Sequence, residues 1–175
     1  YNNVPSLIFE VISVPEGVKS IEDKTFSGCK ELQSVTLPGS ITNIGIGAFI
    51  GCKSLTAVTI PERTTYIGGS AFSGCECLTS VIVPNGVTKI GYSAFSNCKN
   101  LKQIKIPDSL TKIENGTFWG CANLMQITVS NNVTDIEDRA FLGCMTMNNI
   151  VIPSSVVCIG ASAFSGCENL IVRAP

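Results

Sequence analysis

Cysteine is the residue of this sequence whose chemistry and spacing need explaining first. The 175-residue chain contains nine cysteines, and seven of them lie 23 residues apart in near copies of the motif AFSGC. These seven are Cys29, Cys52, Cys75, Cys98, Cys121, Cys144 and Cys167. A thiol repeated in one register could be a metal ligand, half of a disulfide bond, a nucleophile or a small apolar side chain of the core.

The surroundings of these cysteines argue against the first three roles. The chain has no His and no C-x-x-C pair, so it lacks the usual zinc ligands and the base of a Cys–His nucleophile. Thiols stacked in parallel miss the separation of about 3.8 Å between Cβ atoms that a disulfide needs. No carboxylate pair has an apolar setting that would raise one pKa. We therefore expect buried, reduced thiols, no catalytic residue, no metal and no cofactor.

Two further cysteines lie outside this register. Cys77 takes the position that Ser54 has in another repeat, and Cys158 takes the position of Lys89. Because the residues at these positions are polar elsewhere, we expect both thiols to be exposed and to react first with a thiol reagent.

The 23-residue period extends to other residue types. One register consists of Phe26, Phe49, Phe72, Phe95, Phe118, Phe141 and Phe164, and another of Ile21, Ile44, Ile67, Ile90, Ile113, Ile136 and Ile159. Prolines follow the same period. The agreement predicts one array of about seven repeats over residues 12–172, with a partial repeat at 1–11 and the start of another at 173–175. We therefore expect a single domain, 1–175.

Each repeat has the pattern of two extended segments and one tight turn. Segments such as VTLP (35–38) alternate apolar and variable residues and end at a proline, which is typical of short strands. Apolar pairs such as Val87 and Ile90 indicate a second extended segment. Ala94-Phe95 is predicted to open a single helical turn, which a left-handed residue ends because only Gly or Asn stands two positions after the Phe.

Glycine also follows the repeated isoleucine, as at Gly45, but glutamate takes this position in three repeats. We interpret this second set as tolerated. Threonine recurs at Thr42, Thr65, Thr88, Thr111 and Thr134. Ice-binding solenoids carry such ranks on flat faces, but the adjacent rank here is mixed, and we expect hydroxyl bonds between repeats instead.

A repeat of 23 residues cannot bury its own apolar side, whereas stacked repeats bury a continuous column. The pattern thus predicts a solenoid in which one strand per coil joins a parallel sheet. Because the helical turns on the other side are wider, we expect an α/β solenoid that curves with the sheet on its concave face.

The repeats also resemble a known family. Their pattern, as in LKQIKIPDSLTKIENGTFWGCAN (101–123), closely resembles the 23-residue leucine-rich repeats of the BspA-like, or Treponema pallidum, type, over about nine-tenths of the chain. The resemblance implies a right-handed leucine-rich repeat solenoid. It further implies an adhesin-like protein at the cell surface or outside the cell, which binds host matrix or another cell-surface protein. A passive spacer within a larger surface protein is the alternative.

Charge and hydropathy narrow the partners. Twelve Lys and Arg against 13 Asp and Glu give a net charge of −1, with no basic run for nucleic acid. No apolar run approaches the roughly 18 residues of a membrane helix. We expect a protein partner, without nucleic acid or membrane insertion. The sequons at Asn115 and Asn132 would matter only in a eukaryotic secretory route.

The outward residues of the predicted strands form the first candidate binding surface. They are Thr36, Thr59, Ile82, Gln103, Lys105, Gln126, Thr128 and Val151. Most are small and neutral, and Lys105 is the only charged residue at the centre of a predicted strand. We expect a smooth strip that a protein partner can approach closely.

A second candidate surface lies on the convex side. Trp119 and Leu142 replace serine in two consecutive repeats, and Ala122 and Met145 replace Lys or Glu in the same two. Four adjacent apolar residues, which include the only Trp, predict a contact patch for weak self-association or for a neighbouring domain. In the alternative, Trp119 folds over its own coil and shields Met145.

Overall fold

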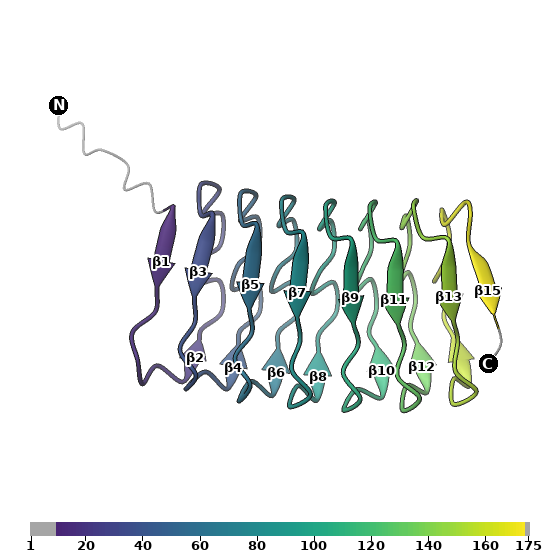
Figure 1. Ribbon diagram of the computed structural model, residues 1–175, viewed down its shortest axis with the longest axis horizontal. Helices are drawn as coiled ribbons and strands as arrows, with labels where there is room; N and C mark the ends of the chain where they lie inside the picture. Colours follow the sequence, from purple (N-terminus) through teal and green to yellow (C-terminus); the bar gives the residue numbers. More distant parts are fainter. Residues whose placement is uncertain (1–9, 174–175) are drawn as a thin grey trace.

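The computed structural model describes residues 10–173, which wind through about seven turns of a solenoid (Figure 1). In each turn a three-residue strand is followed by a two-residue strand. The predicted solenoid of parallel strands is therefore confirmed. Residues 1–9 and 174–175, with most of the predicted terminal partial repeats, lie outside the described residues.

The longer strands stand side by side as one row, here called the front sheet. It contains β1 (Val11–Ser13), β3 (Ser34–Thr36), β5 (Ala57–Thr59), β7 (Ser80–Ile82), β9 (Gln103–Lys105) and β11 (Gln126–Thr128), and β13 (Asn149–Val151) and β15 (Ile171–Arg173) continue the row as a pair. Neighbouring strands are parallel, and from β1 to β11 paired residues are 23 positions apart, as Ile104 and Ile127 are, whereas β13 and β15 pair at an interval of 22. In each front-sheet strand from β3 to β13, the middle of the three residues is buried, so its two neighbours face outward.

The shorter strands form a second row. Four of them make one sheet, β2 (Ser20–Ile21), β4 (Asn43–Ile44), β6 (Tyr66–Ile67) and β8 (Lys89–Ile90), and three make another, β10 (Lys112–Ile113), β12 (Asp135–Ile136) and β14 (Cys158–Ile159). Beside this row the predicted threonine bonds occur, since Thr65 Oγ1 donates to Thr42 O at 3.3 Å and Thr88 Oγ1 to Thr65 O at 3.2 Å. These hydroxyls link neighbouring coils, so their hydrogens are not available to bind ice.

The predicted helical turn is wrong, and with it the α/β assignment, because residues 10–173 contain strands and turns but no helix. Alternate N–H groups of the turn bond the next coil: Lys24 N donates to Ile46 O at 2.9 Å, and Phe26 N donates to Ala48 O at 2.8 Å. An α-helix would need these donors for carbonyls of its own chain segment. The turn therefore serves as a third ladder between coils.

Two positions in each turn have a positive φ, which also excludes a helix. The predicted one follows Phe by two residues and holds Gly28, Gly51, Gly74, Asn97, Gly120, Gly143 and Gly166, with φ between 56° and 76°. The second holds Lys24, Gly47, Ser70, Ser93, Gly116, Arg139 and Ser162, with φ between 52° and 60°. Only two of these seven are glycine, so composition did not reveal it.

The glycines after isoleucine have no positive φ, in agreement with their interpretation as tolerated, but they also let neighbouring coils approach closely. A Cβ on Gly68 would lie 2.6 Å from the backbone carbon of Gly45, and one on Gly91 would lie 2.5 Å from Gly69 N. Their φ is ordinary, so close approach between coils and not conformation favours glycine there, although glutamate takes the same position in three coils.

The core between the rows consists of columns of identical or similar side chains. The phenylalanines from Phe26 to Phe164 stack with ring centroids 5.1–5.9 Å apart and planes within 18° of parallel. Phe49, Phe72, Phe95, Phe118 and Phe141 are fully buried. Offset stacking of aromatic rings adds to the burial energy of each ring.

We predict that Phe118→Ala lowers the free energy of unfolding by about 3–5 kcal/mol, because it leaves a void between two rings that collapse only partly. Its ring lies 5.9 Å from that of Phe95 and 5.4 Å from that of Phe141. Urea denaturation measures the change, with the exposed Thr128→Ala as the matched control. A loss no larger than that of the control would contradict the stacked core.

Candidate functional site

The cysteine column lies in the core, as predicted. Cys52, Cys75, Cys98, Cys121 and Cys144 are fully buried, whereas Cys29 and Cys167 at the two ends are half-buried, and all are free thiols. From the second to the last, each Sγ donates to the carbonyl of the phenylalanine 26 residues earlier, at 3.1–3.3 Å. The thiol is therefore a weak hydrogen-bond donor between coils as well as an apolar filler.

The thiol donor satisfies the second lone pair of one buried carbonyl in each coil. Phe49 O accepts the Cys52 N–H of its own turn at 3.1 Å and the Cys75 thiol of the next coil at 3.3 Å. Both lone pairs of a buried carbonyl are thus used. The F-x-x-C spacing carried this information, because it places the thiol over the preceding phenylalanine carbonyl.

Burial makes these thiols poor nucleophiles. It raises the pKa of Cys52 to about 12, with the neighbouring Cys29 adding to the effect, and it raises the pKa of Cys121 to about 12. The contact with Cys167 and then burial raise the pKa of Cys144, whereas the same contact lowers that of Cys167. A protonated thiol neither attacks an electrophile nor binds a metal well.

The described part of the chain also contains no cluster of side chains suited to bind a metal ion. Within residues 10–173, His, Cys, Asp and Glu side chains form no group of three or more that could hold a metal ion. The same residues include no helix long and apolar enough to cross a membrane.

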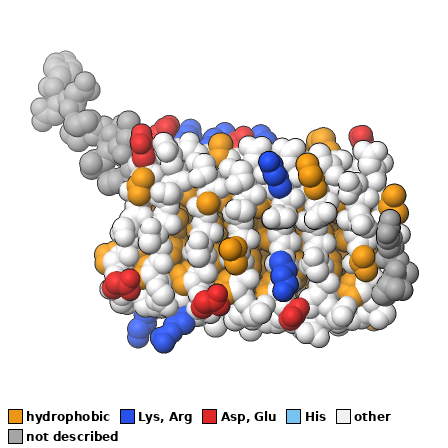
Figure 2. Space-filling view, viewed as in Figure 1, with side chains coloured by type: hydrophobic (Ala, Val, Ile, Leu, Met, Phe, Trp, Pro, Cys, Tyr) orange, Lys and Arg blue, Asp and Glu red, His pale blue; other side chains and the backbone are white. Residues whose placement is uncertain are grey.

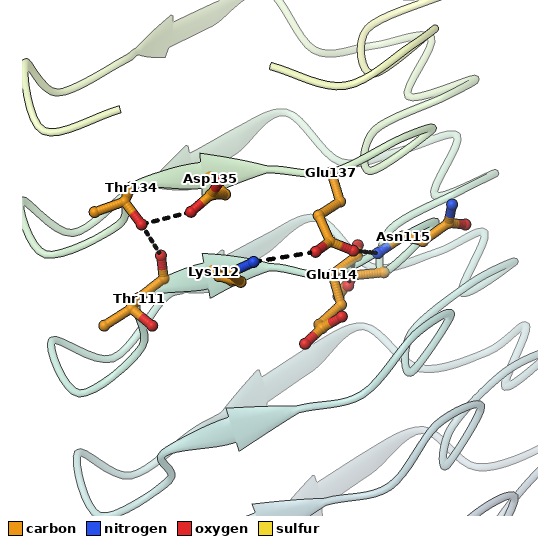
Figure 3. Close-up of polar contacts among 8 residues, drawn as sticks. Thr111, Lys112, Glu114, Asn115, Thr134, Asp135 and Glu137 are labelled. Atoms are coloured by element: carbon orange, nitrogen blue, oxygen red, sulfur yellow. Dashed lines mark hydrogen bonds and ion pairs between the residues drawn. The ribbon is translucent and has the colours of Figure 1, made fainter. Parts of the chain in front are cut away.

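A pair of carboxylates beside β10 and β12 was missed by the sequence analysis (Figure 3). Burial and then the charge of Glu137 raise the pKa of Glu114. Glu137 is already engaged, because its Oε1 lies 3.6 Å from Lys112 Nζ and its Oε2 accepts Asn115 N–H at 3.2 Å. These contacts tie two coils together and leave Glu137 unsuited to act as a free base. The two residues share the register after the repeated isoleucine, where only these two consecutive coils both carry glutamate, and this was the available signal.

The predicted strip on the front sheet is exposed and hollowed. Ile82, Gln103, Lys105, Gln126 and Thr128 line a shallow depression of about 550 Å³ over β7, β9 and β11. Gln126, Thr128 and Val151 share a neighbouring one of about 280 Å³. Thr36 and Thr59 lie outside both depressions, further along the same row.

A third depression of about 450 Å³ adds residues that the sequence analysis missed. It joins Lys102, Met125 and Asn148 to Gln103 and Gln126. Lys102, Met125 and Asn148 share one register 23 residues apart, just before the predicted strands, and this register was the available signal. Lys102 and Lys105 are the only charged residues that line the three depressions.

The four residues of the second candidate surface, here called the turn patch, also come together. Gly120 N donates to Leu142 O at 2.8 Å and Thr146 N to Ala122 O at 3.1 Å, which sets the two turns side by side. Trp119 is 46% exposed and Met145 is 58% exposed, whereas Ala122 and Leu142 are half-buried. Both large side chains therefore remain accessible to a partner.

Short parallel strands, turn ladders and buried columns with a 23-residue period define the class of leucine-rich repeat solenoids. The BspA type leucine rich repeat region matches residues 5–124 and 42–171. The chain therefore belongs to the BspA-type leucine-rich repeat family, as the resemblance of its repeats indicated. Leucine-rich repeats of this kind are typically non-catalytic scaffolds for protein interaction.

Solved bacterial structures share the fold. The T. pallidum leucine-rich repeat protein is 30% identical, with a TM-score of 0.87, and the match covers 94% of this chain and 79% of that protein. A leucine rich cell surface protein from Faecalibacterium prausnitzii is 30% identical, with a TM-score of 0.51 and coverage of 94% and 59%. A leucine-rich repeat protein from Eubacterium ventriosum is 26% identical, with a TM-score of 0.76 and coverage of 95% and 44%. No curated protein matches the sequence.

We predict that thiols react in the order of their exposure. Cys77 and Cys158 are exposed and should be alkylated first, followed by half-buried Cys29 and Cys167. The interior column should react last, because a pKa of about 12 at Cys52 leaves only about one thiol in 10⁴ ionised at pH 8. Timed alkylation and mass spectrometry of the native protein give the order. Rapid labelling of Cys75 or Cys98 would contradict the buried column.

Proposed function

We propose that this chain is a non-catalytic protein-binding module that contacts its ligand through the outward face of the front sheet. The observation that carries the proposal is the strip itself, in which strands from successive coils present exposed, mostly neutral side chains around three depressions that share lining residues. Depressions this open and shallow suit a macromolecular surface better than a small substrate. We also propose that the solenoid is right-handed, that it curves with the front sheet on its concave face, and that residues 1–175 form a single domain.

The proposed setting is the cell surface or the extracellular space. A relative with 30% identity is a leucine rich cell surface protein, and the T. pallidum protein has the same fold. We propose adhesion to host matrix or to another cell-surface protein as the activity of the whole protein. Neither nucleic acid nor membrane insertion is part of this function, given the net charge of −1 and the neutral strip.

A passive spacer is the competing function. It would need only the coil-to-coil ladders and the core, and its outward residues could be exchanged without a loss of binding. The front strip argues for the binding module, because it exposes Ile82 (71%) on the strand next to that of Lys105 and Val151 (47%) two strands from Lys105. Exposed branched apolar residues near a single charge are a reasonable contact surface.

The turn patch supports a second, weaker interface. Its exposed residues Trp119 and Met145 lie where most other coils present serine and charged residues, although Ile50 takes the position of Trp119 in one coil. We propose that it mediates weak self-association or packs against a neighbouring domain.

We predict that Thr59→Arg combined with Gln103→Glu weakens binding to a protein partner by at least tenfold, because both changes place charge on the strip. Partners come from pull-downs with host matrix and serum proteins, and surface plasmon resonance gives the affinities of each variant. Glu31→Gln, an exposed change in the turn before β3, is the control. Unchanged affinity in the double variant would place the contact elsewhere and favour the spacer.

We predict that Trp119→Ser abolishes the weak self-association proposed for the turn patch. Trp119 is the largest side chain of this patch and is 46% exposed. Sedimentation velocity at matched high concentration should show faster-sedimenting species for the wild type than for the variant. Identical monomeric sedimentation of both would eliminate self-association through this surface.

A further inference from the structure

The outward residues of neighbouring front strands form two parallel ranks with different chemistry. In one rank, Gln103 pairs with Ser80 on one side and with Gln126 on the other. In the second rank, two positions further along the strands, Thr128 pairs with Lys105. Ile82 and Val151 extend this rank by one strand on each side.

The second rank places a cation between two apolar side chains. Ile82 is 71% exposed and Val151 is 47% exposed. Parallel strands lie about 4.8 Å apart, so three strand spacings separate Ile82 from Val151 by about 14 Å. Lys105 and Thr128 occupy the two positions between them and offer an ammonium and a hydroxyl donor.

These spacings match an extended peptide laid across the strands. In such a peptide, residues i and i+4 lie about 13 Å apart and residue i+2 lies midway on the same face. With residue i against Ile82 and residue i+4 against Val151, residue i+2 would stand between Lys105 and Thr128. Gln103 and Gln126 lie one rank away, where their amides can bond the peptide backbone.

The charges around the strip indicate which type of side chain the peptide carries at residue i+2. Lys102 and Lys105 line the depressions, and none of the lining residues is acidic. In Figure 2, a basic side chain stands over the middle of the strand row, and the acidic side chains of this face lie toward its upper and lower margins. A carboxylate is therefore the complementary group, since an ammonium and a hydroxyl both donate to it.

We propose that the front strip binds an extended acidic segment of its partner with the pattern apolar–x–Asp/Glu–x–apolar. The two apolar residues cover Ile82 and Val151, and the carboxylate accepts hydrogen bonds from Lys105 and Thr128. This inference rests on the proposed function, because it assigns the partner of the same strip.

A peptide series tests the pattern. The first peptide contains Leu-Ser-Glu-Ser-Leu between Gly-Ser ends, and two others replace the Glu with Gln or Lys. A fourth moves the second Leu two positions closer. Titration into ¹⁵N-labelled protein, followed by the backbone amide shifts of β7 to β13, gives the affinity and the location together.

We expect the Glu peptide to bind about fivefold more tightly than the Gln peptide, the change that an exposed ion pair supplies. The difference should shrink between 50 and 500 mM salt, because the pair is screened. Lys105→Glu should reverse the preference so that the Lys peptide binds best, whereas the exposed Lys30→Glu should not. Ile82→Ser should weaken all peptides that carry both leucines at the correct spacing.

Equal affinity for the Glu and Gln peptides, an unchanged preference in Lys105→Glu, or shifts outside β7 to β13 would each overturn the acidic segment. If Thr59→Arg with Gln103→Glu still weakens binding of a protein partner by at least tenfold in that case, the front strip remains the contact surface and only this inference fails. If that double variant also leaves partner binding unchanged, the proposed function fails with it.

Discussion

Hydrogen bonding between consecutive coils is the interaction on which the rest of this structure depends. Each coil meets the next through the front strands, the short strands and the turn, where the N–H groups of one coil reach the carbonyls of the following one. The turn ladder explains why a sequence with apolar spacing suited to a helical turn forms no helix. Donors such as Phe26 N serve the neighbouring coil at 2.8 Å instead of their own chain segment.

Because the ladders hold residues 23 positions apart in register, every repeated side chain becomes a column. A column places similar groups next to one another, whereas a catalytic pocket needs different groups that meet at one point. A solenoid of this kind therefore builds surfaces more readily than catalytic pockets. The thiols show the consequence. Stacked in the core, Cys52 and Cys121 have pKa values of about 12, and their hydrogens bond phenylalanine carbonyls.

Outward side chains are not needed for the ladders between coils, so they can differ from one repeat to the next. Lys53 and Lys99 lie 2.8 and 3.0 Å from Glu76 in the coil between them, and these hydrogen bonds hold the pKa of Glu76 at about 2. Such exposed ion pairs add little stability. They can vary among repeats without disturbing the core, as can the front strip and the turn patch, which is why specificity can reside there.

The sequence by itself determined the period, the solenoid, the strand positions and the buried columns, because each follows from side-chain type in a fixed register. It also located the exposed strip and the left-handed Gly or Asn two residues after each phenylalanine. Only the tertiary structure showed where the backbone hydrogen bonds of the turn go, since a donor's partner lies 22 residues away and its choice depends on the neighbouring coil. For the same reason, the left-handed Arg139, the close approach at Gly68, the pairing of Glu114 with Glu137 and the depressions over β7 to β13 became visible only when the coils were stacked.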